Sequence, residues 1–343
     1  MKSSVVIGIT LSLLLLTLPA VASDYTLGIY GNANEDDTID MRDLTYVKLI
    51  FFGERPETEL ADAKYDGEIN PLDFVQIKLV IVGKEKELTL VDSADRIVTL
   101  KKPVERAVLV NPYAPDVTQI LRAEDKIVGV AGSIVKDDVY YPELSKLPNV
   151  GYKDYEAMLN LNPDLVVAQV LSAEQKSEKL PGIPVVGYTL YNPKYLSEGI
   201  IQLGYVFDKK DEAKHYLNDF HDKYTDLITA QTKGLSEEEK PKVYAESGRG
   251  TYGTFGAKAG GHQLIEIAGG RNIFADIAEG MVDVDPEAVV ERNPDIIIKY
   301  IYSSKGAGYN SDDISPLKAA WGEMMNRSEL AECSAVKNRM VYV

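Results

Sequence analysis

The chain has 343 residues, of which 45% are hydrophobic and 26% charged, so it is long enough for more than one domain and has the composition of a folded protein. A net charge of −16 argues against a nucleic-acid partner, because phosphate binding depends on clustered lysine and arginine. The single cysteine, Cys333, excludes an internal disulfide and a cysteine-based metal cluster.

The first 22 residues have the pattern of a secretory signal peptide. Lys2 precedes an apolar run over residues 5–18, and the small residues at 20–22 provide a cleavage site. As an alternative, residues 5–22 are just long enough to stay in a bilayer uncleaved. We therefore expect an extracytoplasmic protein, secreted, periplasmic or on the cell surface, associated with the outer face of the cytoplasmic membrane.

A duplicated pattern of oxygen-bearing residues follows this segment. Asn32 and Asp62 each begin a loop that runs into a predicted helix, with side-chain oxygens at positions 1, 3, 5, 9 and 12 and a backbone carbonyl at position 7. This is the ligand set that Ca²⁺ requires. The predicted metal-binding residues are Asn32, Asn34, Asp36, Thr38, Asp40 and Asp43 in the first loop, and Asp62, Asp66, Glu68, Asn70 and Asp73 in the second.

The pair of loops resembles a type I dockerin over residues 24–86, which implies a small all-α calcium-binding module that attaches to a cohesin-domain protein. Two positions depart from that pattern: Asp37 stands where the turn prefers glycine, and Lys64 stands where a ligand oxygen is expected. We therefore expect tight calcium binding in the first loop and weaker binding in the second. The alternative is a pair of acidic helix-capping turns without metal.

Strand and helix patterns alternate after this module. Residues 88–91 and 97–100 predict a hairpin, and strands are predicted at 107–110, 127–130, 165–170 and 185–188 with helices between them, which indicates a parallel sheet. Residues 211–230 contain no proline or glycine and predict a long helix, and the strand pattern resumes at 242–246, 296–302 and 340–343. The predicted domains are a signal peptide (1–22), the dockerin-like module (24–86), lobe one (90–192), a connector helix (193–234) and lobe two (235–343).

One segment occurs twice, beginning at Glu156 and again at Glu287. Each copy has a short helix pattern, an Asn-Pro-Asp turn and an apolar strand, and Pro163 and Pro294 end the helices. The repeat indicates two similar α/β lobes. A cleft between two lobes is a favoured place to bind a small molecule.

A set of motifs occurs in order along the second part of the chain, at residues 105–112, 125–130, 141–144, 150–152, 162–166, 268–273 and 335–342. With these motifs the chain resembles the substrate-binding proteins of ABC importers for iron chelates and cobalamin over about residues 90–343, which implies two Rossmann-like lobes joined by one long helix. In that family one glutamate per lobe contacts the membrane permease, and these positions match Glu156 and Glu287. The alternative is that each carboxylate favours the positive end of its helix.

Ligand-binding residues are expected in the loops at the carboxyl ends of the strands. These loops are rich in tyrosine, which suits a large metal chelate or macrocycle, and Arg249 is the preferred partner for an anionic group, whereas Arg271 alternatively caps a helix end. His262 is expected to be structural. The predicted ligand-binding residues are Tyr113, Gln169, Tyr188, Tyr191, Arg249, Tyr252, Arg271 and Tyr302, within the wider loops 111–115, 133–141, 247–255 and 300–303.

An enzymatic function is not expected. Residues 248–253 formally match a dinucleotide-binding fingerprint, but the glycines that follow delay the helix and no acidic residue stands at the required spacing.

The remaining alternative is an adhesion, sensor or scaffold subunit attached through the dockerin-like module. The ligand stays open among siderophores, haem, cobalamin and oxyanions. Relatives usually continue beyond residues 335–343, so lobe two is expected to close more economically or to be truncated.

Overall fold

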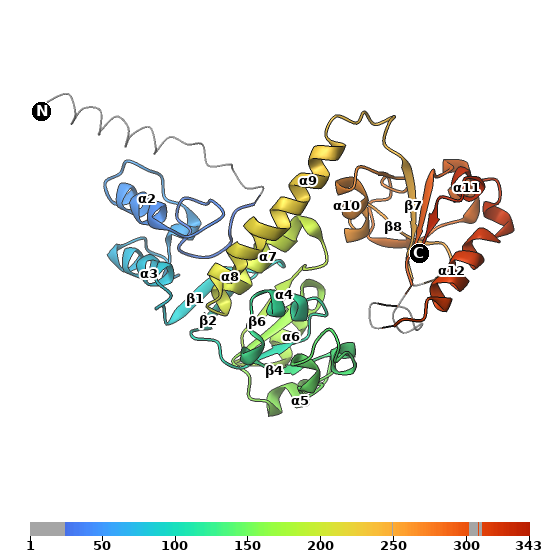
Figure 1. Cartoon of the computed structure of the whole chain (residues 1–343). Helices are drawn as coiled ribbons and strands as arrows, with labels where there is room; N and C mark the ends of the chain where they lie inside the picture. Colours follow the sequence, from blue (N-terminus) through green and yellow to red (C-terminus); the bar gives the residue numbers. More distant parts are fainter. Residues whose placement is uncertain (1–24, 249, 302–307, 309–310) are drawn as a thin grey trace, which may run out of the picture. The chain divides into compact units, whose positions relative to one another are not determined.

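The computed structural model describes residues 25–248, 250–301, 308 and 311–343, and it divides the chain into two compact units, Met1–Lys102 and Pro103–Val343 (Figure 1). The predicted signal peptide, Arg249 and Tyr302 lie outside the described residues. Each unit is described by itself below. In the described residues, no helix is long and apolar enough to cross a membrane.

Two similar loop–helix segments form the centre of the first unit. Asp40 and Asn70 cap the two helices, and in each case the acidic residue three positions later closes a capping box. Pro71 occupies the first turn of the second helix, where its missing N–H removes no hydrogen bond. The elements are α2 (Met41–Phe51), the 3₁₀ turn η1 (Glu59–Ala61), α3 (Pro71–Ile81), β1 (Glu87–Val91) and β2 (Ile97–Lys101).

The β1–β2 hairpin belongs to this first unit. Ile29 forms an antiparallel bridge with Leu90, and the Tyr30 N–H donates to the Thr89 carbonyl at 2.9 Å. The Gln76 side chain of α3 donates to the Glu87 carbonyl at 2.8 Å. The sequence prediction that lobe one begins at residue 90 therefore needs a correction, because these contacts hold the hairpin against the N-terminal loops.

Lobe one contains a four-stranded parallel sheet in the order β4-β3-β5-β6. The sheet is built from nearly continuous apolar runs, as expected for strands buried on both faces. Met158 of α5 and Ala173 of α6 pack with Val108 and Val166 of the sheet. The elements are β3 (Ala107–Leu109), α4 (Ala114–Ile120), η2 (Glu124–Lys126), β4 (Ile127–Val130), η3 (Gly132–Lys136), η4 (Leu144–Lys146), α5 (Tyr155–Asn160), β5 (Leu165–Gln169), α6 (Val170–Lys179), β6 (Val185–Tyr188) and α7 (Pro193–Val206).

Lobe two contains a second four-stranded parallel sheet, in the order β12-β11-β7-β9, and a separate antiparallel pair of β8 and β10. Tyr244, Ile297 and Val341 face one hydrophobic cluster, while Val243 and Ala245 pack with Ile265 of α10 on the other face. The elements are β7 (Lys242–Glu246), β8 (Gly253–Phe255), α10 (Gly260–Ile267), β9 (Arg271–Asn272), β10 (Met281–Asp283), α11 (Pro286–Arg292), β11 (Ile296–Lys299), α12 (Ser315–Met325), η7 (Ser328–Leu330), α13 (Ser334–Lys337) and β12 (Val341–Tyr342).

The repeated segment forms the same structure in both lobes. Its helices are α5 and α11, its strands are β5 and β11, and Asn162 and Asn293 adopt left-handed conformations with φ of 48° and 45°. Asparagine tolerates this region better than most residues. The aspartate that follows accepts backbone N–H bonds from the start of the neighbouring strand: Asp164 from Arg106 at 3.0 Å, and Asp295 from Lys242 at 2.8 Å.

The helix predicted over residues 211–230 is present, but the first part of the connector segment 193–234 forms a separate helix. Residues 193–206 form α7, which is largely buried in lobe one. A turn separates α7 from one continuous helical stretch made of α8 (Lys210–Tyr216), a π-helical turn η5 (Leu217–His221) and α9 (Asp222–Thr232). The connecting helix therefore begins at Lys210, and none of the residues of α9 is buried.

Candidate functional site: an aromatic surface at the junction of the lobes

In lobe one, the carboxyl ends of three strands are held together by Asn111. Its buried amide group donates to the carbonyls of Ala168 at 3.2 Å and Tyr188 at 3.0 Å, and its oxygen accepts the Tyr113 N–H at 3.0 Å. Tyr113 follows β3 and stands at the start of α4. Its ring lies 5.8 Å from that of Tyr191, at 45°, and both rings are partly exposed. These two tyrosines are therefore available to a ligand.

The other two lobe-one predictions have different outcomes. Gln169 is the last residue of β5 and is partly buried, at the same edge of the sheet as Tyr113. Tyr188 is only 1% exposed, so its ring belongs to the interior of the lobe. The prediction that Tyr188 contacts the ligand is corrected, because a strand residue in a doubly covered sheet is buried; its contribution to the site is its carbonyl bond to Asn111.

In lobe two, Phe255 at the end of β8 and Tyr300 after β11 form an edge-to-face pair with ring centres 5.4 Å apart. Two glycines of α10 connect this pair with lobe one. A Cβ on Gly261 would lie 2.7 Å from the Phe255 ring, and one on Gly260 would overlap the Tyr191 carbonyl oxygen. The absence of side chains here lets α10 approach both groups. The two aromatic pairs, Tyr113 with Tyr191 in lobe one and Phe255 with Tyr300 in lobe two, are together called the aromatic surface, and the contact of Gly260 with the Tyr191 backbone is where the two lobes meet.

A buried charge cluster supports the lobe-two part of this surface. Glu246, fully buried at the end of β7, accepts a bidentate pair of hydrogen bonds from Arg327, at 2.5 and 2.9 Å, and an ion pair from Lys299. The Tyr252 N–H also donates to Glu246, at 3.1 Å, and the Arg327 guanidinium stacks 4.8 Å from the Tyr252 ring. Sequence reasoning missed this cluster; a glutamate and a lysine ending two apolar strands were the available signal.

The electrostatics of Glu246 follow from these contacts. Burial alone would raise the pKa of Glu246, but the hydrogen bonds from Arg327 and Lys299 outweigh that effect and hold the pKa below its ordinary value. The carboxylate therefore remains ionised and pairs with both cations, and Glu323 supplies a second negative charge at Arg327. Tyr252 is held in a left-handed conformation with φ of 64°, and its buried hydroxyl has no hydrogen-bond partner among the described residues. This hydroxyl lies in the interior of lobe two, so the prediction that Tyr252 contacts the ligand is corrected for the same reason as that of Tyr188.

The remaining predicted residues of lobe two are less favourable. Arg271 pairs in register with Lys242, the first residue of β7, so it lies at the amino edge of the sheet, opposite to the carboxyl ends where Tyr252 lies. Its assignment as a ligand-binding residue is corrected for this reason. Arg249 and Tyr302 lie outside the described residues. The His262 ring nitrogen is within 3.3 Å of the Asn272 side chain, a contact internal to lobe two.

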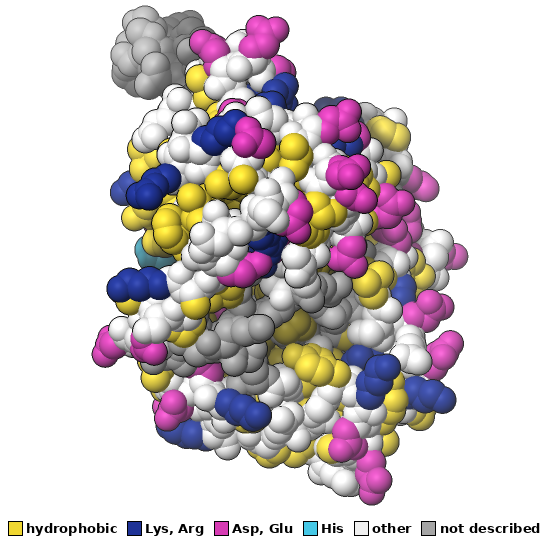
Figure 2. Space-filling model, turned by 90° about the vertical axis from the view of Figure 1, so that its right-hand side faces the viewer, with side chains coloured by type: hydrophobic (Ala, Val, Ile, Leu, Met, Phe, Trp, Pro, Cys, Tyr) yellow, Lys and Arg dark blue, Asp and Glu magenta, His cyan; other side chains and the backbone are white. Residues whose placement is uncertain are grey.

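The two glutamates of the repeated segment occupy matching positions. Glu156 and Glu287 are both exposed in the first turn of a short helix, and an aspartate caps each helix: Asp154 and Asp285 accept backbone N–H groups at 3.0 and 2.8 Å. Because the aspartates already satisfy the helix ends, the glutamates are not needed as caps. On the face shown in Figure 2, many acidic side chains lie along the right-hand side, with basic side chains between them.

The two loops of the first unit share one hydrogen-bond pattern. Asp43 accepts the N–H groups of Asn34 at 3.2 Å and Asp40 at 2.7 Å, and Asp73 accepts those of Lys64 and Asn70 at 2.9 and 2.8 Å. Both aspartates are fully buried. Burial raises the pKa of Asp43 to about 6.

A calcium ion fits part of this arrangement. The buried Asn32 side-chain oxygen, at position 1 of the first loop, has no partner among the described residues, which suits a cation ligand. Arg42, however, pairs with Asp36 at 2.9 Å and Asp40 at 3.0 Å. In the described part of the chain, no three His, Cys, Asp or Glu side chains are grouped so as to hold a metal ion. The donor types therefore fit calcium. For Asp36 and Asp40 to bind the ion, their ion pairs with Arg42 must break.

Comparisons with known proteins agree with this architecture. The family model described as periplasmic binding protein matches residues 109–343, more than half of the chain, so the chain belongs to the periplasmic binding protein family. An uncharacterized ABC transporter substrate-binding lipoprotein of Bacillus subtilis is 28% identical over 223 residues, covering 61% of this chain and 68% of that protein. A vitamin B12-binding protein of Vibrio parahaemolyticus is 26% identical over 248 residues, covering 70% and 81%.

Solved structures show the same fold. The molybdate-binding protein MolA of Haemophilus influenzae superposes with a TM-score of 0.57 at 23% identity, covering 74% of this chain and 82% of that one. At this level of identity the likeness supports the two-lobe α/β fold alone. The matched relatives named here are binding proteins rather than enzymes.

Proposed function

We propose that the chain is the extracytoplasmic substrate-binding protein of an ABC importer, and that it carries a metal chelate of the siderophore, haem or cobalamin type between its lobes. The observation that carries this proposal is the aromatic surface formed by Tyr113, Tyr191, Phe255 and Tyr300. Flat apolar faces with polar edges suit a large planar or ring-shaped ligand. The vitamin B12-binding relative supports this ligand class.

The charges at the site favour a chelate over a bare oxyanion. An oxyanion site needs cations that are free to bond to it. In the described residues around the aromatic surface, Arg327 and Lys299 are both engaged by Glu246, and Arg271 lies at the other edge of the sheet.

Binding experiments on the full chain test the proposal. Haemin, cyanocobalamin, a ferric catecholate siderophore and molybdate are titrated in turn by calorimetry. We expect one of the three chelates to bind with a Kd of about 1 nM to 1 µM, the range that allows both capture and release, and molybdate not to bind. Tyr113→Ala or Phe255→Ala should weaken binding about tenfold, whereas Tyr342→Ala, an exposed tyrosine of the edge strand β12, should not. Unchanged affinity in both site variants contradicts the proposed cleft.

Docking to the permease is proposed for Glu156 and Glu287, whose helices are capped by other residues. Reversing both charges to lysine should abolish uptake and leave ligand affinity unchanged. The matched control reverses Glu178 and Glu291, which are also exposed and also provide one carboxylate per lobe. If the control abolishes uptake equally, the loss comes from net charge and not from docking.

The N-terminal unit is proposed to be a dockerin-like module that binds calcium and attaches the chain to a cohesin-domain protein. The matching hydrogen bonds of Asp43 and Asp73 support it, as does the unpartnered oxygen of Asn32. Calorimetry of the full chain should show one tight and one weaker calcium site, with Asp43→Ala removing the first and Asp73→Ala the second. Absence of binding at millimolar calcium excludes the module. Cohesin binding without any chelate binding would instead support the scaffold function.

A further inference from the structure

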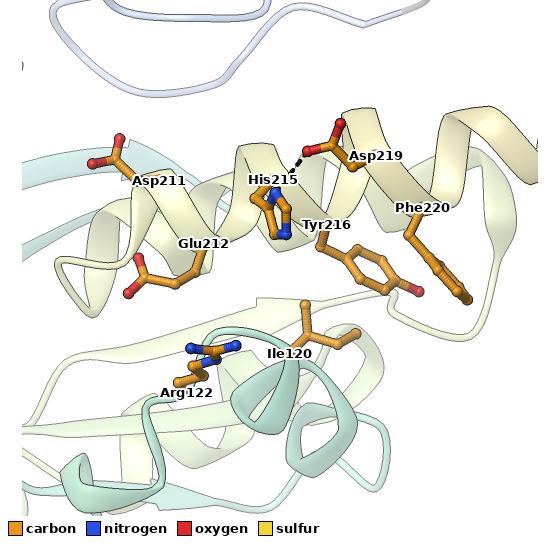
Figure 3. A pocket seen from close by; sticks show the side chains of 8 residues that line it. All are labelled: Ile120, Arg122, Asp211, Glu212, His215, Tyr216, Asp219 and Phe220. Carbon is orange, nitrogen blue, oxygen red and sulfur yellow. Dashed lines mark ion pairs between the residues drawn. The ribbon is translucent and has the colours of Figure 1, made fainter.

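A groove of about 660 Å³ lies outside the proposed chelate site, between the end of α4 and the α8–η5 part of the connecting helix (Figure 3). Ile120 and Arg122 form one wall, and the helix supplies the other. The groove shares no residue with the aromatic surface at the junction of the lobes. Its lining residues are Ile120, Arg122, Asp211, Glu212, His215, Tyr216, Asp219 and Phe220.

Aromatic rings extend along the helix from this groove. Tyr216 and Phe220 stack with ring centres 5.4 Å apart and an interplanar angle of 27°, and Phe220 lies 4.8 Å from Tyr224. Phe220 and Tyr224 are more than half exposed, at 52% and 54%. The rings therefore contribute little to the core. The helix also widens here into its π-helical turn, an irregular form that occurs frequently at functional sites.

Negative charge surrounds these rings. Asp211, Glu212 and Asp219 line the groove, and Arg122 is the one Lys or Arg among the lining residues. Asp219 contacts the His215 ring at 2.6 Å. Glu212 points toward the side of the groove that holds Arg122, below the helix in Figure 3. Glu212 also pairs with Lys209 at 3.6 Å, and both side chains remain partly exposed. An anionic ligand would meet three carboxylates, which disfavours its binding.

We propose that this groove binds a small organic cation, an ammonium or guanidinium group carried on an apolar body. Aromatic faces attract such cations through their negative π-surface, and nearby carboxylates add to the attraction. A groove of about 660 Å³ is within the size range of small-molecule sites. The inference is independent of the chelate cleft, since the two sites share no residue.

Ligand-observed NMR on the full chain tests the proposal with three soluble probes that share a phenyl ring: benzyltrimethylammonium, benzyl alcohol and phenylacetate. We expect saturation transfer to the cation alone, with a Kd in the millimolar range or below. Phe220→Leu keeps apolar volume but removes the ring, and should weaken binding about fivefold. Phe52→Leu makes the same change at an exposed position of the first unit and should have no effect.

Two charge variants give the sharpest outcome. Glu212→Gln should weaken binding of the cation about two- to threefold, because it removes a negative charge from the groove. Arg122→Gln should strengthen binding, because it removes a positive charge. Circular dichroism confirms that each variant is folded. The proposal would be overturned if benzyl alcohol bound as well as the cation, or if the cation bound more weakly to Arg122→Gln. It would also be overturned if a basic peptide bound while benzyltrimethylammonium gave no response.

Discussion

Replacing Glu246 by glutamine tests the role of the buried cluster in lobe two. The substitution keeps the shape of the side chain but removes the negative charge that Arg327 and Lys299 share, and these side chains are only 7% and 12% exposed. Removing one partner of a buried ion pair costs about 3–5 kcal/mol, because the remaining charge is left without compensation. We expect a loss of this size in the free energy of unfolding of lobe two.

The control uses the same guanidinium. Glu323 accepts a hydrogen bond from the Arg327 Nε at 2.7 Å but is 51% exposed, so Glu323→Gln should cost less than about 1 kcal/mol. Urea unfolding followed by the fluorescence of Trp321, the single tryptophan and part of α12 in lobe two, measures both variants. If Glu246→Gln loses no more stability than Glu323→Gln, the cluster does not stabilise the lobe as reasoned here.

The pH dependence of this difference has a defined sign. Because the pKa of Glu246 is lowered in the folded chain, its carboxylate contributes stability that is fully present above the unfolded pKa and is lost as the pH falls through the folded pKa. The stability gap between wild type and Glu246→Gln should therefore be constant near neutral pH and should shrink under acidic conditions. A gap that widens on acidification would contradict the assigned ionisation.

Two further pairs of substitutions, each a test with its control, have expected outcomes. Gly260→Ala should destabilise the chain by about 1–3 kcal/mol, because its Cβ would overlap the Tyr191 carbonyl, whereas Gly322→Ala, in α12 with no atom within 4 Å of the added Cβ, should stabilise it by about 0.5–1 kcal/mol. Thermal unfolding followed by circular dichroism measures both variants. Stability changes of the same sign in both variants would contradict this difference in packing. Asp164→Ala should lower the free energy of unfolding by about 1.5–3 kcal/mol, because the Asp164 carboxylate accepts backbone N–H groups at the start of β3. Asp125→Ala, at an exposed position, should lower it by less than about 0.5 kcal/mol, and chemical denaturation measures both variants.

Local patterns were sufficient for most of the α/β framework. The strands β3, β4, β5, β6, β7 and β11 and the hairpin lie within one or two residues of the predicted ranges at their starts, because apolar runs bounded by turns determine them. The strands β8, β9 and β10 have two or three residues each and were not predicted. These three strands are defined by their partners, and no apolar run marks them in the sequence.

Long-range contacts account for the errors in the candidate site. Glu246 meets Lys299 and Arg327 across 53 and 81 residues of sequence, and no local pattern connects them. Tyr188 and Arg271 were selected by their place after or near a strand, but burial and register decide their role: the first ring is in the interior, and the second side chain is at the amino edge. Tyr113 and Tyr191, which follow strands at the carboxyl edge and are exposed, stay predicted ligand contacts.

The paired aspartates of the repeated segment also bear on how the chain folds. Asp164 reaches back 58 residues to Arg106, and Asp295 reaches back 53 residues to Lys242, so each lobe closes a loop of nearly the same length. Loop-closure entropy depends on the logarithm of length, and the two closures differ by only about 0.1 kcal/mol. Neither lobe has an entropic advantage over the other. The two sheets can therefore nucleate in parallel, and the order in which they form is set by their side chains.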